Sequence, residues 1–254
     1  MADRTTGWGI GEGRCSRRRW TRLVSWFGLL AASAAAVGCA VRQPSPVAAG
    51  QDLFTGDLQE IAPYHDGDEW VRRVSGGTPL DGVLIERISE LAPDGTFTSV
   101  TTRDGKALSR MHLRSDGTSV ALESDEIELV GMRFVYDPPL PVVGVPLRTG
   151  ELKFEGRVHL FRMDGKPIAD GSVESTRILA PAAPESQADF TLQQEIRMQM
   201  GPQRMVDRTT SWLRRGVGSV HTESVLNGKP TRSDLVCATI AGRKTGACES
   251  GSTQ

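Results

Sequence analysis

Alternation of apolar and polar residues runs through most of the chain and predicts β-strands. The clearest example covers residues 188–200, where the apolar positions fall on one face of an extended chain: Phe190, Leu192, Ile196, Met198 and Met200. Gln194 is the polar interruption on that face. Weaker alternation predicts further strands over 69–74, 83–88, 96–100, 107–113, 151–163, 168–178, 205–213, 217–226 and 232–240.

Turn signals separate these runs. Asp-Gly begins at residues 66, 81, 94, 104, 116, 164 and 170, and Asn-Gly begins at residue 227. Such dipeptides accept positive φ and close tight hairpins, so the spacing predicts an antiparallel meander. Calcium loops are the alternative, but the chain has no Asp-x-Asp-x-Asp-Gly pattern. Residues 134–146 contain four prolines, which predicts an extended segment on the surface or at a sheet edge.

The chain beyond the N-terminal region has no helical period, so helix is expected to be minor. The fold class that follows is all-β and mainly antiparallel. We expect a single large curved sheet, a half-barrel meander with little helix, preceded by a signal helix. The curvature would hide the apolar face of the sheet.

The N-terminal region has the layout of a secretory signal. Arginines at 17–19 and 22 precede residues 23–37, which carry no charge, and Gly38 and Cys39 follow. The ending Ala-Val-Gly-Cys at 36–39 resembles the lipobox of bacterial lipoproteins, although leucine is usual where Ala36 stands. The resemblance implies that Cys39 is lipidated and becomes the new N-terminus. Ala40, rather than Asp, follows the cysteine, which in a host with two membranes implies sorting to the outer one.

Three alternatives compete with a lipoprotein signal. A transmembrane helix needs about 20 apolar residues, and residues 23–38 fall short of that length. An ordinary signal peptide with an Ala-x-Ala site fits the alanine-rich run. A buried core helix is the third alternative, and the arginine cluster argues against it.

These features divide the chain into four segments. Residues 1–38 are a lipoprotein signal peptide, 39–60 a flexible tether, 61–240 an antiparallel β domain, and 241–254 a C-terminal tail. The signal segment holds six arginines and two acidic residues, whereas the whole chain carries −1, so the remaining residues carry −5. A mildly acidic exported domain is a poor candidate for nucleic-acid binding, which needs clustered Lys and Arg.

Two of the four cysteines remain after lipidation and signal removal. Cys237 and Cys248 would lie in an oxidising compartment, where a disulfide closing a small loop is the natural interpretation. Two free thiols are the alternative. No His, Asp or Glu lies between them, which argues against a metal site.

Three segments together resemble a group of bacterial exported β-proteins. They are Gly-Asp-Glu-Trp-Val at 67–71, Tyr-Asp-Pro-Pro-Leu-Pro at 136–141, and residues 210–220, which contain Trp212 and a Gly-Val-Gly sequence. Such proteins resemble the lipoprotein-carrier superfamily of LolA- and LolB-like proteins. The resemblance implies a half-barrel with an apolar concavity, and it implies the fold more firmly than any cargo.

A ligand in such a concavity would contact the apolar face of the longest strands. The candidate ligand-binding residues are Phe190, Leu192, Ile196, Met198 and Trp212. Core packing is the alternative role for Trp212 and for Trp70.

Motifs for catalysis are missing from the sequence. It contains no Gly-x-Ser-x-Gly, no His-Glu-x-x-His and no phosphate-binding Gly-x-x-x-x-Gly-Lys. The four histidines are widely separated: His65, His112, His159 and His221. The acidic residues 125, 126 and 128 are interpreted as a solvated strand edge, and Arg214-Arg215 as a solvated turn. We therefore expect no catalytic residues, no metal and no cofactor.

The leading functional hypothesis is a non-enzymatic, lipid-anchored protein of the bacterial cell envelope that binds a hydrophobic ligand. It would be held at the outer membrane by its N-terminal lipid. A structural or interaction module of an envelope protein complex is the alternative, and a hydrolase is a third. An open apolar cavity would favour a ligand, whereas a filled interior would favour a scaffold.

Overall fold

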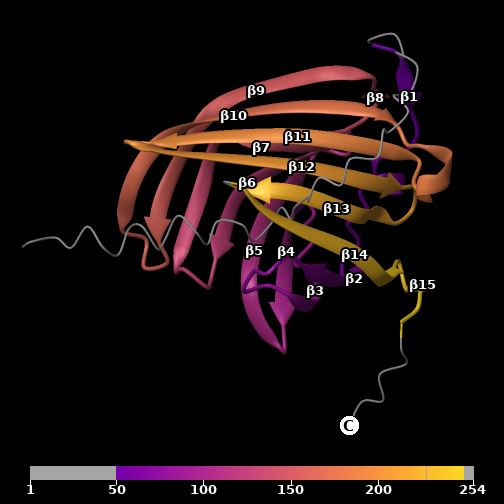
Figure 1. Cartoon of the computed structure of the whole chain (residues 1–254), viewed down its shortest axis with the longest axis horizontal. Coiled ribbons are helices and arrows are strands. Elements are labelled where there is room, and N and C mark those ends of the chain that lie inside the picture. Colours follow the sequence, from indigo (N-terminus) through magenta and orange to yellow (C-terminus); the bar gives the residue numbers. More distant parts are fainter. Residues whose placement is uncertain (1–49, 227, 249–254) are drawn as a thin grey trace, which may run out of the picture.

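The computed structural model describes residues 50–226 and 228–248, most of which lie in antiparallel strands (Figure 1). The predicted signal peptide and Cys39 lie outside the described residues. The strands are β1 (Asp52–Phe54), β2 (Glu69–Ser75), β3 (Gly82–Ser89), β4 (Thr96–Arg103), β5 (Lys106–Ser115), β6 (Ser119–Ile127), β7 (Met132–Gly144), β8 (Leu147–Arg148), β9 (Gly150–Arg162), β10 (Pro167–Pro181), β11 (Phe190–Met200), β12 (Gln203–Arg214), β13 (Gly218–Leu226), β14 (Lys229–Ile240) and β15 (Arg243–Gly246). Two short 3-10 helices, η2 (Leu58–Glu60) and η3 (Pro184–Ser186), complete the described elements.

One sheet accounts for nearly the whole fold, and it closes on itself. Consecutive strands pair from β2 round to β14, with β8 bypassed between β7 and β9, and β14 then pairs with β2. β13 and β14 pair as well, so β2–β7 and β9–β14 form a twelve-stranded barrel. The all-β, antiparallel prediction is confirmed. The sheet closes, however, where a half-barrel was expected, because β14 pairs with β13 along one edge and with β2 along the other.

Two side chains reinforce the place where the barrel closes. The indole Nε1 of Trp70 donates to the carbonyl of Val217 at 2.7 Å, and a guanidinium nitrogen of Arg72 donates to the carbonyl of Ser219 at 2.9 Å. The carbonyl of Val217 directly precedes β13 and that of Ser219 lies at its start, before the ladder with β14 begins at His221. Hydrogen bonds from the side chains of β2 therefore join it to the start of β13, where the ladder between β13 and β14 has not yet begun.

The barrel wall contains a seam between β7 and β9. Their ladder joins Met132–Asp137 to Arg162–Arg157 and extends no further among the described residues. Beyond Asp137, β7 pairs only with β6, while the first half of β9 pairs only with β10. Three prolines of β7, at 138, 139 and 141, have no N–H to donate across this gap. The proline-rich segment thus begins as a central strand and continues along the edge of the seam.

The chain before β2 closes one end of the barrel. Leu58 and Ile61 are 1% and 2% exposed, and β1 pairs with β8 to form a small separate sheet. Phe54 and Leu147 of these strands pack with Ile61 and with residues of β10 and β11. The described residues 50–60 are therefore part of the folded domain, whereas the sequence placed them in the flexible tether. Apolar residues at 53, 54, 58 and 61 are what fix this segment to the barrel.

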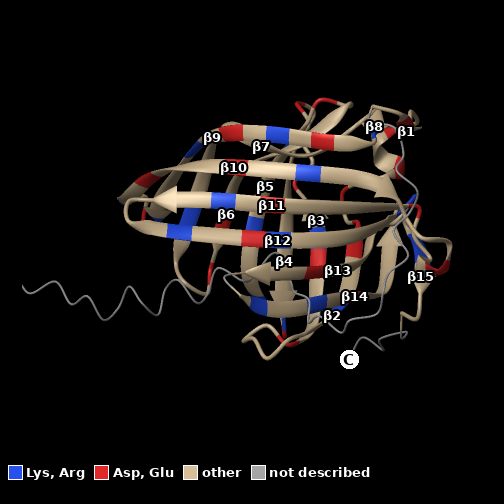
Figure 2. Ribbon diagram, turned by 45° about the horizontal axis from the view of Figure 1, so that its top comes forward, with Lys and Arg blue, Asp and Glu red and all other residues tan. Residues whose placement is uncertain are grey.

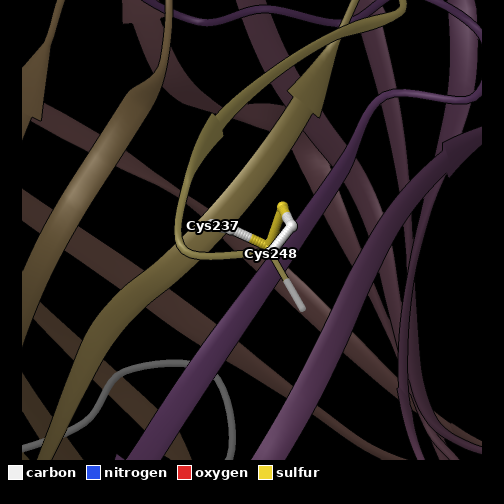
Figure 3. The surroundings of a disulfide bond; sticks show 2 residues. All are labelled: Cys237 and Cys248. Carbon is white, nitrogen blue, oxygen red and sulfur yellow. A yellow bond between two sulfur atoms is a disulfide. The ribbon is translucent and has the colours of Figure 1, made fainter. Parts of the chain in front are cut away.

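The C-terminal residues are also more ordered than expected. β15 pairs with β14 through four residue pairs, within the segment interpreted as a tail. Cys237 of β14 and Cys248 are joined by a disulfide, with their Cα atoms 5.1 Å apart (Figure 3). The bridge holds the end of the described chain against the barrel.

Most Asp-Gly dipeptides lie in turns, as at Asp104-Gly105 between β4 and β5 and at Asp164-Gly165 between β9 and β10. Asp170-Gly171 is an exception, since it lies within β10. A Cβ at Gly171 would come within 2.2 Å of the carbonyl oxygen of Gln199 on β11. Glycine is required there by the close approach of two strands and not by a turn.

Candidate functional site

The barrel encloses a cavity of about 480 Å³. At one end it is bounded by Ile61, Pro63 and Tyr64 of the segment that closes the barrel, and Tyr64 stacks on Phe97 with ring centroids 5.1 Å apart. Beside the cavity, β7, β9 and β10 contribute core residues that are no more than 3% exposed: Phe134, Val158, Leu160 and Val173. The volume lies within the range of roughly 300–1,000 Å³ that is typical of small-molecule sites.

Three of the five candidate ligand-binding residues line this cavity. Leu192, Ile196 and Met198 of β11 do so. Phe190 begins the same strand, but it packs in the cluster at the closed end, 6.3 Å from the ring of Phe54. Trp212 is placed against His221 with ring centroids 4.7 Å apart.

The phase of β12 explains the position of Trp212. Residues 205, 207, 209, 211 and 213 line the cavity, so the side chains at even-numbered positions face away from it. The alternation along β12 was therefore sufficient to predict that Trp212 faces away from the cavity. Trp70, in contrast, lines the cavity and is 5% exposed.

Charged residues interrupt the apolar lining on several strands. Arg72, Glu86, Asp125, Arg177 and Asp207 all line the cavity. Asp125 is 7% exposed, so its interpretation as part of a solvated edge is wrong. It occupies an inward position of β6, two residues before the buried Ile127.

Two of these charges form a closed network. Arg72 Nε lies 3.3 Å from Glu86 Oε2, and Ser99 donates its hydroxyl to Glu86 Oε1 at 3.1 Å. Arg72 also donates to the carbonyl of Ser219. This pair therefore holds β2, β3, β4 and β13 together, and both of its charges are compensated.

The other three charged groups each have a buried atom without a hydrogen-bond partner among the described residues. These atoms are Nη2 of Arg177, Oδ1 of Asp125 and Oδ1 of Asp207. Burial raises the pKa of Asp125 to about 7, and neighbouring Glu126 adds to this shift. Burial likewise raises the pKa of Asp207 to about 7, against a hydrogen bond from Thr209 that lowers it.

Burial lowers the pKa of the Arg177 guanidinium to about 10, so the side chain stays charged at neutral pH. Buried polar atoms are normally paired, and leaving one unpaired costs about 1–3 kcal/mol, more when the group is charged. Groups of this kind that face a void are the expected lining of a site whose occupant completes their hydrogen bonds. Sequence reasoning missed all three, although Arg177 interrupts the inward face of β10 in phase with Val173 and Leu179.

Each histidine pairs with a carboxylate, and the four pairs lie apart on different strands or loops. They are His65–Asp68 at 3.0 Å, His112–Glu126 at 3.5 Å, His159–Asp170 at 2.7 Å and His221–Asp234 at 2.7 Å. Within the described part of the chain, no three His, Cys, Asp or Glu residues are grouped so as to hold a metal ion.

The predicted solvated turn at Arg214-Arg215 has a more specific structure. The Arg215 guanidinium lies over the rings of Phe54 and Phe190, at 4.9 and 5.4 Å from their centroids. Its backbone N–H donates to Asp189 at 2.7 Å. The exposed arginine thus covers two aromatic residues at the closed end of the barrel.

The outer wall carries both signs of charge. Positive and negative residues are interspersed along β9–β12 (Figure 2), and Glu195 pairs with both Arg197 and Arg208 there. Such interspersed pairs are typical of a solvated surface. No helix among residues 50–226 and 228–248 has the length and hydropathy needed to cross a bilayer.

The sequence matches no family model and no curated protein. Two solved structures are similar to the barrel. One is a Bacteroides fragilis protein described as exported and as having a YmcC-like fold; it is 16% identical, with a TM-score of 0.43, covering 72% of this chain and 97% of its own.

The second is a Parabacteroides distasonis protein described as a lipoprotein; it is 13% identical, with a TM-score of 0.39, covering 79% of this chain and all of its own. Neither description names a ligand. Neither structure is described as a LolA- or LolB-like carrier, so the resemblance to that superfamily stays a prediction.

Proposed function

We propose that this protein is a non-enzymatic, lipid-anchored protein of the bacterial cell envelope that binds a small ligand with a large apolar part inside its barrel. The observation that carries the proposal is the cavity of about 480 Å³, lined by apolar side chains and by polar atoms that have no hydrogen-bond partner within residues 50–226 and 228–248. The resemblance of residues 36–39 to a lipobox supports the anchor.

The shape of the interior supports a ligand over a scaffold. A sheet that serves only as a scaffold gains stability from a filled interior, since close packing maximises apolar burial and dispersion contacts. Here Leu192, Ile196 and Met198 face a void.

The proposal is tested with N-phenyl-1-naphthylamine, a neutral apolar dye that fluoresces in apolar surroundings. We expect the full-length protein, purified and stripped of lipid, to bind the dye in the cavity. Thr209→Phe should abolish binding, because Thr209 lines the cavity and the added ring would occupy it. Thr210→Phe is the matched control, since the neighbouring residue faces the outside of the same strand.

Two results would contradict the proposal. The first is that the unaltered protein does not bind the dye. The second is that Thr209→Phe and Thr210→Phe lose dye binding to the same extent. Circular dichroism and thermal unfolding establish that each variant is folded. Should Thr209→Phe fail to fold, Ile196→Phe, which adds volume to the same cavity, takes its place.

A further inference from the structure

Arg177 differs from the other arginine that lines the cavity. Arg72 is paired with Glu86 and bonded to Ser219. Arg177 is 8% exposed, and its Nη2 has no partner among the described residues. A charged guanidinium carries five N–H donors in a rigid fork and is suited to bidentate binding of an oxyanion.

The carboxylates of the cavity do not serve as its counter-ion. The ion pairs among the described residues that involve arginine do not include Arg177, and burial is the cause of its lowered pKa, with no acidic neighbour opposing it. The pKa values of Asp125 and Asp207 are both raised, whereas a cation in contact would lower them. Arg177 is therefore an uncompensated positive charge that faces the void.

An apolar track leads away from this charge. In the ladder between β10 and β11, Arg177 is opposite Gln194, and Val173 is opposite Met198. Met198 is in turn opposite Met205 of β12. Between Gln194 and Met198 the strand advances by about 13 Å. Ile196, Met198 and Met205 line the cavity along this length, and Asp207, opposite Ile196, is the one carboxyl among the described residues of β11 and β12 that lines it there.

The closed end of the barrel lies on the other side of Arg177, where Leu179 packs with Phe54. Arg177, which unlike Arg72 has no counter-ion among the described residues, thus stands near one end of a mainly apolar space. A ligand that is apolar throughout would leave the guanidinium buried and unpaired, which is costly. A ligand with an anionic head and an apolar chain would satisfy both parts of the site.

We infer that the cavity binds an anionic amphiphile, with its oxyanion head on Arg177 and its apolar chain along Ile196, Met198 and Met205. This inference rests on the proposed function, because it specifies the chemistry of the ligand in the same cavity. The head can be a carboxylate or a phosphate monoester, since both present paired oxygens to the guanidinium fork.

Displacement of bound N-phenyl-1-naphthylamine tests the inference with three ligands of equal chain length: dodecanoate, dodecyl phosphate and dodecanol. We expect at least one anionic ligand to displace the dye at concentrations at least about tenfold lower than dodecanol does, since hydrogen bonds to charged groups contribute more than neutral ones. Comparison of dodecanoate with dodecyl phosphate identifies the preferred head. Inorganic phosphate, which has no chain, should not displace the dye.

Arg177→Gln should abolish this preference, so that dodecanol and the anionic ligands displace the dye at similar concentrations. Arg177→Lys, which retains the charge, should keep part of it. Arg208→Gln is the matched control, because Arg208 is an exposed arginine that pairs with Glu195 on the outer wall. It should bind all three ligands as the unaltered protein does.

The outcomes separate the two proposals. A protein that binds neither the dye nor any of the three ligands contradicts the proposed function. Equal affinity for dodecanol and both anionic ligands, or an anionic preference that survives in Arg177→Gln, overturns the inference and leaves the proposed function standing. If Arg177→Gln does not fold, the comparison of anionic and neutral ligands in the unaltered protein still decides the inference.

Discussion

Replacement of Asp125 by asparagine should change how the stability of the barrel depends on pH. Burial against the cavity raises the pKa of this carboxyl from 3.8 to about 7. Between these two values the folded protein holds a proton that the unfolded chain has released. The free energy of unfolding of the unaltered protein therefore falls as the pH rises through this interval. Above about pH 7 the loss due to Asp125 no longer grows.

The magnitude follows from the size of the shift. Each unit of pKa difference corresponds to about 1.4 kcal/mol, so the full shift corresponds to about 4 kcal/mol. Asparagine cannot ionise, so the unfolding free energy of the variant does not fall with pH for this reason. The difference in unfolding free energy, variant minus unaltered protein, should be about 4 kcal/mol larger at pH 7.5 than at pH 4. Asp207 is present in both proteins, so its own raised pKa cancels in this difference.

Urea unfolding followed by circular dichroism, at several pH values between about 4 and 8, measures this difference. Asp116→Asn is the control, because hydrogen bonds from Thr118 and Ser119 lower the pKa of Asp116 to about 2. That carboxylate is ionised in both states above about pH 5, so over that range its curve should stay parallel to that of the unaltered protein. If the plot of unfolding free energy against pH for Asp125→Asn also runs parallel to that of the unaltered protein, the argument that burial keeps this carboxyl neutral is refuted.

Three further predictions concern the anchor and the core. Cys39→Ser should abolish incorporation of a labelled fatty acid in cells and release the protein from membranes, as measured by fractionation; retention of the label would contradict the lipobox interpretation. Phe134→Ala should lower the unfolding free energy by about 3–5 kcal/mol, because Phe134 is 1% exposed in the hydrophobic core. Leu152→Ala, at a side chain 63% exposed, should change it by less than about 1 kcal/mol in the same urea titration. Trp70→Phe should cost about 1–3 kcal/mol, since it leaves the carbonyl of Val217 without its donor; an unchanged midpoint would show that this bond does not hold the junction.

Local signals in the sequence were sufficient to predict the strands and several of their turns. Alternation over 188–200 placed Leu192, Ile196 and Met198 on one face, and these three side chains do line one surface. Asp-Gly at 104 and at 164 marks tight turns because both residues of the first pair and the glycine of the second adopt positive φ. These features depend on neighbours in the chain, so the sequence shows them directly.

Closure of the sheet depends on pairing between distant segments, and no local pattern encodes it. The ladder that joins β14 to β2 connects residues more than 150 positions apart. The role of the segment before β2 could not be predicted for the same reason. Its few apolar residues, among them Leu58 and Ile61, are buried only because distant strands form the end of the barrel on which they pack.

The charged cavity residues were missed for a different reason. Arg177, Asp125 and Asp207 each stand at an inward position of an otherwise apolar face, and composition alone assigns such residues to the surface. Their phase within the strand is the signal that could have identified them. A polar residue in register with an apolar face is therefore worth treating as a candidate site residue in a predicted barrel of this kind.

The seam between β7 and β9 affects how the barrel can deform. Widening a fully laddered wall breaks several backbone hydrogen bonds together, and each of them must be regained on closing. Between residues 138–144 of β7 and 150–156 of β9 the described ladder offers none to break. Leu152, 63% exposed, and Val142, 37% exposed, line the two lips of this gap. The two strands can therefore bend apart here without breaking any backbone hydrogen bond of the described ladder between them.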